Sequence, residues 1–107
     1  MLVIENSLAL AIDFQERLMN LIHHSEGLIR KSAIFIEGCR ILGVPVLVTQ
    51  QYTKGLGGTV PPIKAALMEY EPIEKITFSC FRDEGFMGRL EQAGKRDVVV
   101  TGIEAHI

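Results

Sequence analysis

The chain has 107 residues, of which 48% are hydrophobic and 22% charged, with a formal net charge of −2. This length is typical of one domain that can bury a hydrophobic core. The slight acidic excess gives no electrostatic basis for binding nucleic acid or an anionic membrane, and no segment approaches the about 18 apolar residues of a membrane-spanning helix. With only 2 cysteines a disulfide framework is excluded, so we expect a cytoplasmic protein.

The first half of the chain predicts a strand, a short helical turn and a long helix. Residues 8–12 are apolar without alternation, as in a strand covered on both faces, and they end at Asp13. A helical or turn-like segment is expected over residues 14–22. A longer helix follows over residues 27–42, with Gly43 in the left-handed conformation that ends many helices. The 3.6-residue period predicts one buried face on this helix: Leu28, Phe35, Cys39 and Leu42.

The second half continues the alternation of strands and helices. Residues 44–48 predict a buried strand, residues 50–62 a long polar loop rich in glycine, and residues 63–70 one or two helical turns. A short strand is expected over residues 72–77. Asp83 is predicted to cap a helix, whose apolar residues and terminal glycine are Phe86, Leu90, Ala93 and Gly94.

Strands that alternate with helices predict a single doubly wound α/β domain over residues 1–107, with a mostly parallel sheet and helices on both faces. The last strand of this sheet is expected over residues 98–100. Open sheets of this kind place their chemistry outside the carboxyl ends of the strands, and Asp13, Lys75 and Glu104 lie at or near such ends. A lone aspartate is more often a helix cap and a lone lysine more often solvated, but together they indicate an Asp/Lys site.

Several segments, in order along nearly the whole chain, carry a resemblance to a known family. They are AIDFQ (11–15), GVPVLVTQQY (43–52), GLGGTVP (55–61), EKITFS (74–79) and VTGIEAHI (100–107). Together they resemble the isochorismatase-like cysteine hydrolase family. The loop over residues 51–61 is similar to that of the isochorismatase-domain-containing branch in particular. Because several segments match in order, the resemblance is more specific than any one motif.

The resemblance implies a Rossmann-like three-layer fold and a role for several residues. Asp13 matches the catalytic aspartate, Lys75 the catalytic lysine, and residues 102–107 the segment before the nucleophile. That nucleophile is usually a cysteine and corresponds to position 108, after the last residue of this sequence. A non-proline cis peptide of the family maps to the Ile103–Glu104 bond, and it would aim the Glu104 N–H at a developing oxyanion. Family domains are longer and commonly self-associate, which implies C-terminal elements after residue 107 and a homo-oligomer.

The activity implied by the resemblance is hydrolysis of an amide-type C–N bond in a small molecule. Asp13 would take the proton of the thiol, Lys75 would stabilise the charges, and the thiolate would attack a carbonyl carbon. Two alternatives stay open. An isochorismatase-type vinyl-ether hydrolase keeps the aspartate and the lysine but lacks the cysteine, and a non-catalytic member of the fold binds a metabolite or a protein. The residue at position 108 decides between the two enzymes.

Other residues that could carry chemistry have simpler interpretations. Cys80, considered as an alternative nucleophile, is interpreted as a small buried residue, and so is Cys39. Metal-binding relatives have an Asp-x-His pattern where this chain has residues 50–52 (QQY), and residues 23–24 (HH) are interpreted as a solvated pair. We therefore expect neither a metal nor another cofactor.

Three residues are candidates to line the substrate pocket: Phe14, Gln50 and Tyr52. Each is equally well explained as an ordinary core or loop residue. The glycine-rich residues 55–58 lack the Lys-Ser/Thr pair and the helix of a phosphate-binding loop, so they predict a flexible pocket wall or an oligomer contact. His106 is assigned no role.

Overall fold

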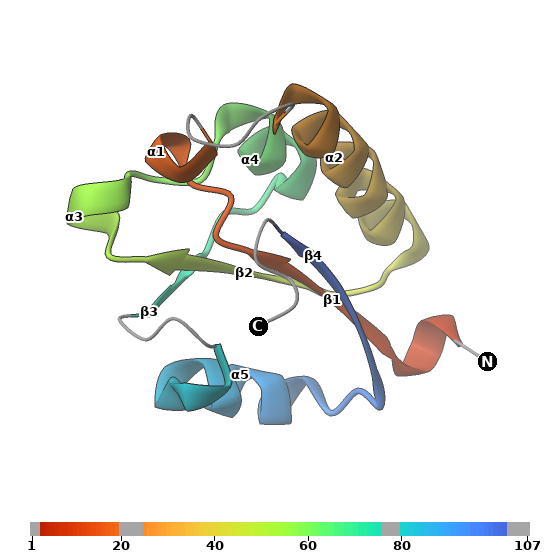
Figure 1. Cartoon of the computed structure of the whole chain (residues 1–107). Helices are drawn as coiled ribbons and strands as arrows, with labels where there is room; N and C mark the ends of the chain where they lie inside the picture. Colours follow the sequence, from red (N-terminus) through yellow and green to blue (C-terminus); the bar gives the residue numbers. More distant parts are fainter. Residues whose placement is uncertain (1–2, 20–24, 76–79, 103–107) are drawn as a thin grey trace.

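The sheet and its helices follow the predicted alternation (Figure 1). The computed structural model describes residues 3–19, 25–75 and 80–102. These residues form a four-stranded parallel sheet in the order β3-β2-β1-β4. Its strands are β1 (Ser7–Ile12), β2 (Val46–Gln51), β3 (Ile73–Lys75) and β4 (Asp97–Gly102). The helices are α1 (Glu16–Met19), α2 (Ser25–Leu42), α3 (Thr53–Leu56), α4 (Pro61–Leu67) and α5 (Glu84–Ala93), with short 3-10 helices η1 (Ile4–Asn6) and η2 (Cys80–Arg82).

The order of the strands reverses at β1. The chain moves outward from β1 to β2 and β3, and β4 then pairs with the opposite side of β1. Ile12 pairs with Thr49, and Gln51 pairs with Lys75, so the carboxyl ends of the first three strands lie together. Ligands of open α/β sheets bind outside the carboxyl ends of the strands where this order reverses. The topology therefore directs attention to the residues that follow β1.

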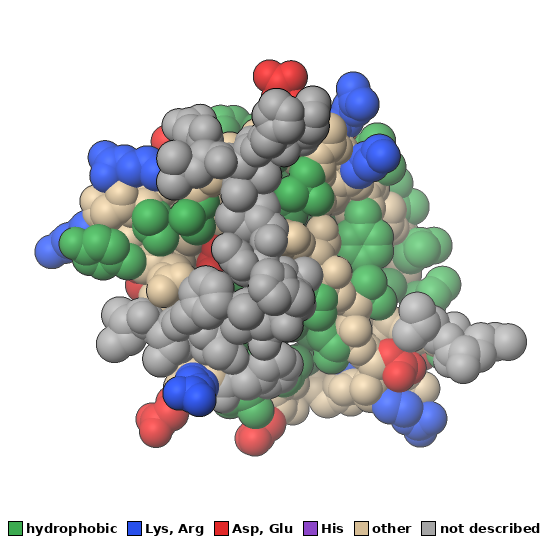
Figure 2. Space-filling view, in the orientation of Figure 1, with side chains coloured by type: hydrophobic (Ala, Val, Ile, Leu, Met, Phe, Trp, Pro, Cys, Tyr) green, Lys and Arg blue, Asp and Glu red, His purple; other side chains and the backbone are tan. Residues whose placement is uncertain are grey.

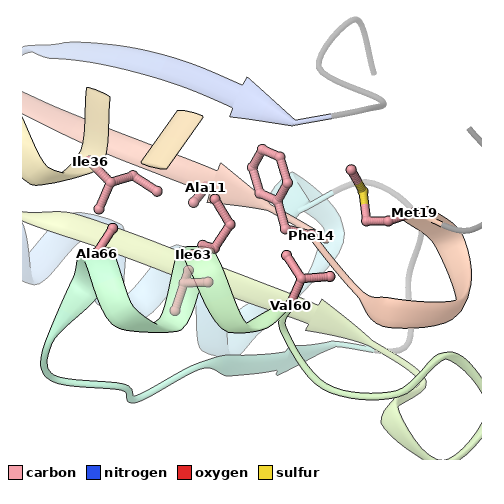
Figure 3. Packing of buried hydrophobic residues seen from close by; sticks show 8 residues of the cluster. Ala11, Phe14, Met19, Ile36, Val60, Ile63 and Ala66 are labelled. Carbon is pink, nitrogen blue, oxygen red and sulfur yellow. The ribbon is translucent and has the colours of Figure 1, made fainter. Parts of the chain in front are cut away.

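Hydrophobic clusters cover both faces of the sheet in the described part of the chain. The first cluster packs α2 and α4 against the sheet, and Figure 3 shows Phe14, Ile36 and Ile63 within it. The second includes Leu8, Leu10 and Phe86 and lies toward α5, which Figure 1 places opposite α2 and α4. Successive residues of a strand point to opposite faces, which is why β1 serves both clusters. Each fully buried Leu or Phe contributes about 1.5–3 kcal/mol.

The buried face of α2 differs in part from the prediction. Leu28 and Phe35 are half-buried against the first cluster, as expected, but Leu42 is 58% exposed. Each step of seven residues falls about 20° short of two full turns. This drift accumulates along the helix, so Leu42 no longer faces the sheet. Gly43 follows with φ of 77°, the predicted left-handed conformation. The buried residues of the helix are Ser32, Ile36 and Cys39.

The segment predicted as a loop over residues 50–62 contains regular structure. Strand β2 continues through Gln51, helix α3 follows at once, and helix α4 begins at Pro61. Adjacent prolines suit the first turn of a helix, because the N–H groups there have no intrahelical partner. The prediction of one continuous loop was therefore wrong, because a high content of glycine and proline does not exclude short helices.

Helix α5 matches its prediction at both ends. Asp83 is the N-cap, and its Oδ2 accepts a hydrogen bond of 2.8 Å from the Phe86 backbone N–H. Gly94 ends the helix in the left-handed conformation, with φ of 61°. The polar cap and the terminal glycine fix the length of the helix that covers the second cluster.

Some large apolar side chains remain exposed on the described surface. Figure 2 shows hydrophobic side chains gathered where Figure 1 places α2. The exposed apolar residues of α2 and β4 are Ile34, Ile41, Leu42, Val98 and Val100. Within the described ranges, no helix combines the length and apolar character needed to cross a membrane.

Candidate active site

Asp13 and Lys75 form a buried ion pair at the carboxyl ends of β1 and β3. Lys75 Nζ lies 2.9 Å from Asp13 Oδ2, and their side chains are 0% and 4% exposed. Asp13 comes directly after β1 and Lys75 ends β3, so the parallel sheet brings together residues far apart in sequence. The structure thus brings together the two residues that the sequence analysis proposed as an Asp/Lys site. Burying two charges is expensive, which makes this pair a candidate functional centre.

The backbone of Asp13 has an uncommon conformation. Its φ is 54°, in the left-handed region that residues other than glycine seldom occupy. The Asp13 N–H donates to the Thr49 carbonyl at 3.2 Å, and the Asp13 carbonyl accepts from the Gln15 N–H at 2.8 Å. Such conformations persist where the surrounding structure enforces them, and they cluster at functional sites. The backbone therefore turns sharply at the proposed base.

Thr49 is a buried neighbour of Asp13 that the sequence analysis did not single out. Its hydroxyl donates a 2.8 Å hydrogen bond to Asp13 Oδ1, and the residue is fully buried. Asp13 therefore has a partner on each carboxylate oxygen, Thr49 on one and Lys75 on the other. The sequence marks this position, because Thr49 is the first polar residue after the apolar run over 44–48 and β2 continues beyond it.

Cys80 lies behind Thr49, with its Sγ 4.0 Å from Thr49 Oγ1. It is 4% exposed, in agreement with its interpretation as a buried residue. Burial raises the pKa of the Cys80 thiol, although the positive charge of Lys75 opposes this effect. Burial also raises the pKa of the Cys39 thiol, which lies in the core side of α2. Both environments favour the neutral thiol and not the thiolate required of a nucleophile.

The three candidates for the substrate pocket have different environments. Phe14 is fully buried in the first hydrophobic cluster, which favours the core interpretation (Figure 3). Gln50 is 4% exposed, and its Oε1 accepts from the backbone N–H and hydroxyl of Thr59 and from the Tyr70 hydroxyl. Tyr52 is 61% exposed at the start of α3. Of these side chains, only that of Tyr52 is open to solvent.

Polar contacts fix the segment between β2 and α4. The Gln50 Nε2 donates to Thr53 Oγ1 at 3.1 Å, and the Thr53 N–H donates to Glu74 Oε1 at 3.0 Å. The Thr53 hydroxyl also donates to Glu74 and is the main cause of the lowered pKa of that carboxyl. These contacts connect α3 to β3, next to Lys75.

Gln15 fastens the same segment to the turn after β1. Its side chain is fully buried. The Nε2 donates to the carbonyls of Gln51 and Gly57, at 2.8 Å each, and the Oε1 accepts from the Gln51 N–H at 2.7 Å. One amide thereby contacts both the last residue of β2 and the chain that follows it. The sequence analysis included Gln15 in a matching segment but assigned it no role.

Several predicted features lie outside the described residues. These are Glu104 and its backbone N–H, the Ile103–Glu104 peptide bond, His106 and residues 23–24. Their assignments stay predictions. In residues 3–19, 25–75 and 80–102, no group of three or more His, Cys, Asp or Glu side chains could hold a metal ion.

A cavity of about 370 Å³ lies away from the ion pair. It opens beside the amino end of β2, between the ends of α2 and α4. Its lining includes Ile36, Arg40, Val46, Leu67 and Arg89. None of the predicted site residues contributes to it, so we place the candidate active site by its chemistry and its position on the sheet.

The doubly wound sheet places the chain in the α/β class. The buried Asp–Lys pair lies at the carboxyl ends of the strands, where such folds carry their chemistry. The isochorismatase domain matches residues 7–107 of the chain. The chain therefore belongs to the isochorismatase family.

Individual relatives agree with this assignment. The chain is 32% identical over 101 residues to isochorismatase domain-containing protein 2 of Danio rerio, with 94% of this chain and 50% of that protein covered. It is 36% identical over 97 residues to isochorismatase domain-containing protein 1 of Salmo salar, with 89% and 33% covered. The solved structure of the MAR1 ribonuclease from Caenorhabditis elegans is 37% identical with a TM-score of 0.85, and 98% and 54% are covered. The chain thus spans a third to about half of these relatives.

Proposed function

We propose that the whole protein is a hydrolase that cleaves an amide-type C–N bond in a small molecule through Asp13, Lys75 and a cysteine at position 108. The observation that supports this proposal is the buried Asp13–Lys75 pair at the carboxyl edge of the sheet. Membership of the isochorismatase family supports it as well.

The proposed reaction has two steps. In the first, Asp13 takes the proton of the thiol at position 108, and the thiolate attacks the carbonyl carbon. The backbone N–H groups of Glu104 and position 108 stabilise the oxyanion, an effect worth about 2.7–4 kcal/mol per donor. Asp13 then protonates the leaving amine, and a thioester remains. In the second step Asp13 takes a proton from water, the hydroxide attacks the thioester, and the proton returns to the sulfur.

Lys75 has an electrostatic role in this proposal. Its ammonium lies 2.9 Å from Asp13 Oδ2, and both side chains are almost completely buried. A positive charge at this place balances the charge of the carboxylate and of a thiolate next to it. Interactions between charges are stronger in such a site than in water, because little solvent screens them.

Hydrolysis of a phosphodiester in RNA is a second candidate. The observation in its favour is the 37% identity to the solved structure described as a ribonuclease. The net charge of −2 gives little electrostatic attraction for a polyanion. Vinyl-ether hydrolysis and ligand binding without catalysis are further outcomes. The substrates below separate the three hydrolytic activities, and a protein that turns over none of them but is thermally stabilised by a ligand would be a binding member of the fold.

The test uses the full-length protein with small amides, a vinyl ether and single-stranded RNA as substrates. We expect turnover of an amide, and a covalent adduct at position 108 with an aldehyde analogue, located by mass spectrometry. Asp13→Ala should abolish turnover. Cleavage of RNA alone would establish the second candidate. The absence of an adduct, together with undiminished turnover by Asp13→Ala, would overturn the proposed mechanism.

We also propose that the protein is a cytoplasmic homo-oligomer without a resident metal. The exposed apolar residues of α2 and β4 support association. Light scattering of the full-length protein after size exclusion tests it, and a monomer at micromolar concentration would contradict the proposal.

A further inference from the structure

We infer that Thr49 is a positioning residue that fixes the carboxylate of Asp13 for proton transfer, an inference that rests on the proposed function. Two contacts carry it. The Thr49 hydroxyl donates to Asp13 Oδ1 at 2.8 Å, and the Thr49 carbonyl accepts the Asp13 N–H at 3.2 Å. A single residue of β2 therefore holds both the backbone and the carboxylate of the proposed base.

Asp13 needs such support because its own position is unfavourable. The φ of 54° is an uncommon conformation for aspartate. A carboxylate that is held only by Lys75 on Oδ2 could rotate about its Cβ–Cγ bond. The second contact, on Oδ1, removes this freedom. A general base works only when it is aimed within hydrogen-bond reach of the proton that it accepts.

The Thr49 hydroxyl is itself oriented by its surroundings. It is fully buried, and the thiol of Cys80 lies 4.0 Å from its oxygen, where it acts as a weak donor. A hydroxyl has a single proton, so a donor on the Cys80 side leaves that proton directed toward Asp13. Burial raises the pKa of the Cys80 thiol, which therefore keeps the proton that it donates. These groups form a buried chain from Cys80 through Thr49 to Asp13.

The test compares three variants of the full-length protein with the wild type. Thr49→Val keeps the branched shape and removes the hydroxyl, whereas Thr49→Ser keeps the hydroxyl and removes a methyl group. Ser7→Ala is the matched control, because the Ser7 hydroxyl is also buried and hydrogen-bonded, to the Val3 carbonyl, at the opposite end of β1. The kcat and KM for the best amide substrate are measured, together with unfolding in urea to show that each variant is folded.

We expect Thr49→Val to lower kcat by about 10- to 100-fold, the range for a lost hydrogen bond to a charged group or a misplaced base. KM should change by less than about threefold, and Thr49→Ser should recover most of kcat. Ser7→Ala should match the wild type in kcat. Equal kcat in Thr49→Val and the wild type would overturn the inference, and so would a Thr49→Ser variant as impaired as Thr49→Val.

A spectroscopic measurement separates this inference from the proposed function. If the wild type turns over no substrate, the proposed function fails, and the contact is then tested by the ¹³C chemical shift of the Asp13 carboxyl carbon. That shift should change in Thr49→Val and stay unchanged in Ser7→Ala. An unchanged shift in Thr49→Val would overturn the positioning role.

Discussion

Removal of the negative charge of Asp13 should destabilise the protein strongly. Asp13→Asn is the sharpest change, because asparagine keeps the size and tolerates positive φ better than most residues. The Lys75 side chain is 0% exposed and would lose the carboxylate 2.9 Å from its ammonium. Breaking a buried pair in this way costs about 3–5 kcal/mol, against a total stability of about 5–15 kcal/mol for a typical protein.

Urea unfolding followed by circular dichroism measures this loss in the full-length protein. The double variant Asp13→Asn/Lys75→Met should recover most of the stability, since both charges of the buried pair are removed together. Glu71→Gln is the control for charge removal, because Glu71 is an exposed carboxylate that precedes β3, and it should change the stability by less than about 0.5 kcal/mol. A loss below about 1 kcal/mol in Asp13→Asn, or a larger loss in the double variant, would refute the reasoning.

Three further changes test other parts of the structure. Asp83→Ala removes the cap of α5 and should lower the free energy of unfolding by about 1 kcal/mol in urea melts; an unchanged midpoint would argue against the cap. Iodoacetamide should label Cys39 and Cys80 slowly at neutral pH and rapidly in urea, since burial raises both pKa values and limits access; peptide mass mapping that finds either thiol labelled rapidly in the native protein would contradict their burial. Gly102→Ala places a Cβ 2.7 Å from the Ile12 carbonyl oxygen and should cost about 1–3 kcal/mol in unfolding, and a variant as stable as the wild type would show that β1 and β4 lie farther apart.

The fold was predictable because its signals are local. The apolar run over residues 8–12 indicates a buried parallel strand and the valines over 98–100 a further strand. Both lie in strands of the sheet, although Val98 and Val100 are exposed. The cap at Asp83 and the glycine at 94 define α5 in the same way. The segment over residues 50–62 was not predictable, because its helical turns depend on side-chain contacts with distant elements.

The candidate site was predictable only in its charged residues. Asp13 stands out because it directly follows an apolar strand, and Lys75 because it lies in a predicted strand near its carboxyl end. Parallel strands end at one edge of a sheet. Thr49 and Gln15 were missed as contacts because their partners follow from the register of β1 against β2, which no local pattern specifies. Gln50 illustrates the same limit: its place after a strand suggested a pocket residue, whereas its hydrogen bonds with Thr59 and Tyr70 are visible only in the structure.

The kcat of Asp13→Asn on the best amide substrate tests the central proposal most directly. It is measured with the full-length protein, at a temperature where circular dichroism shows the variant folded. If Asp13 transfers the proton of the thiol, kcat should fall by at least about 100-fold, within the range for loss of a general base. Turnover equal to that of the wild type would contradict the proposal that the buried Asp13–Lys75 pair carries the reaction.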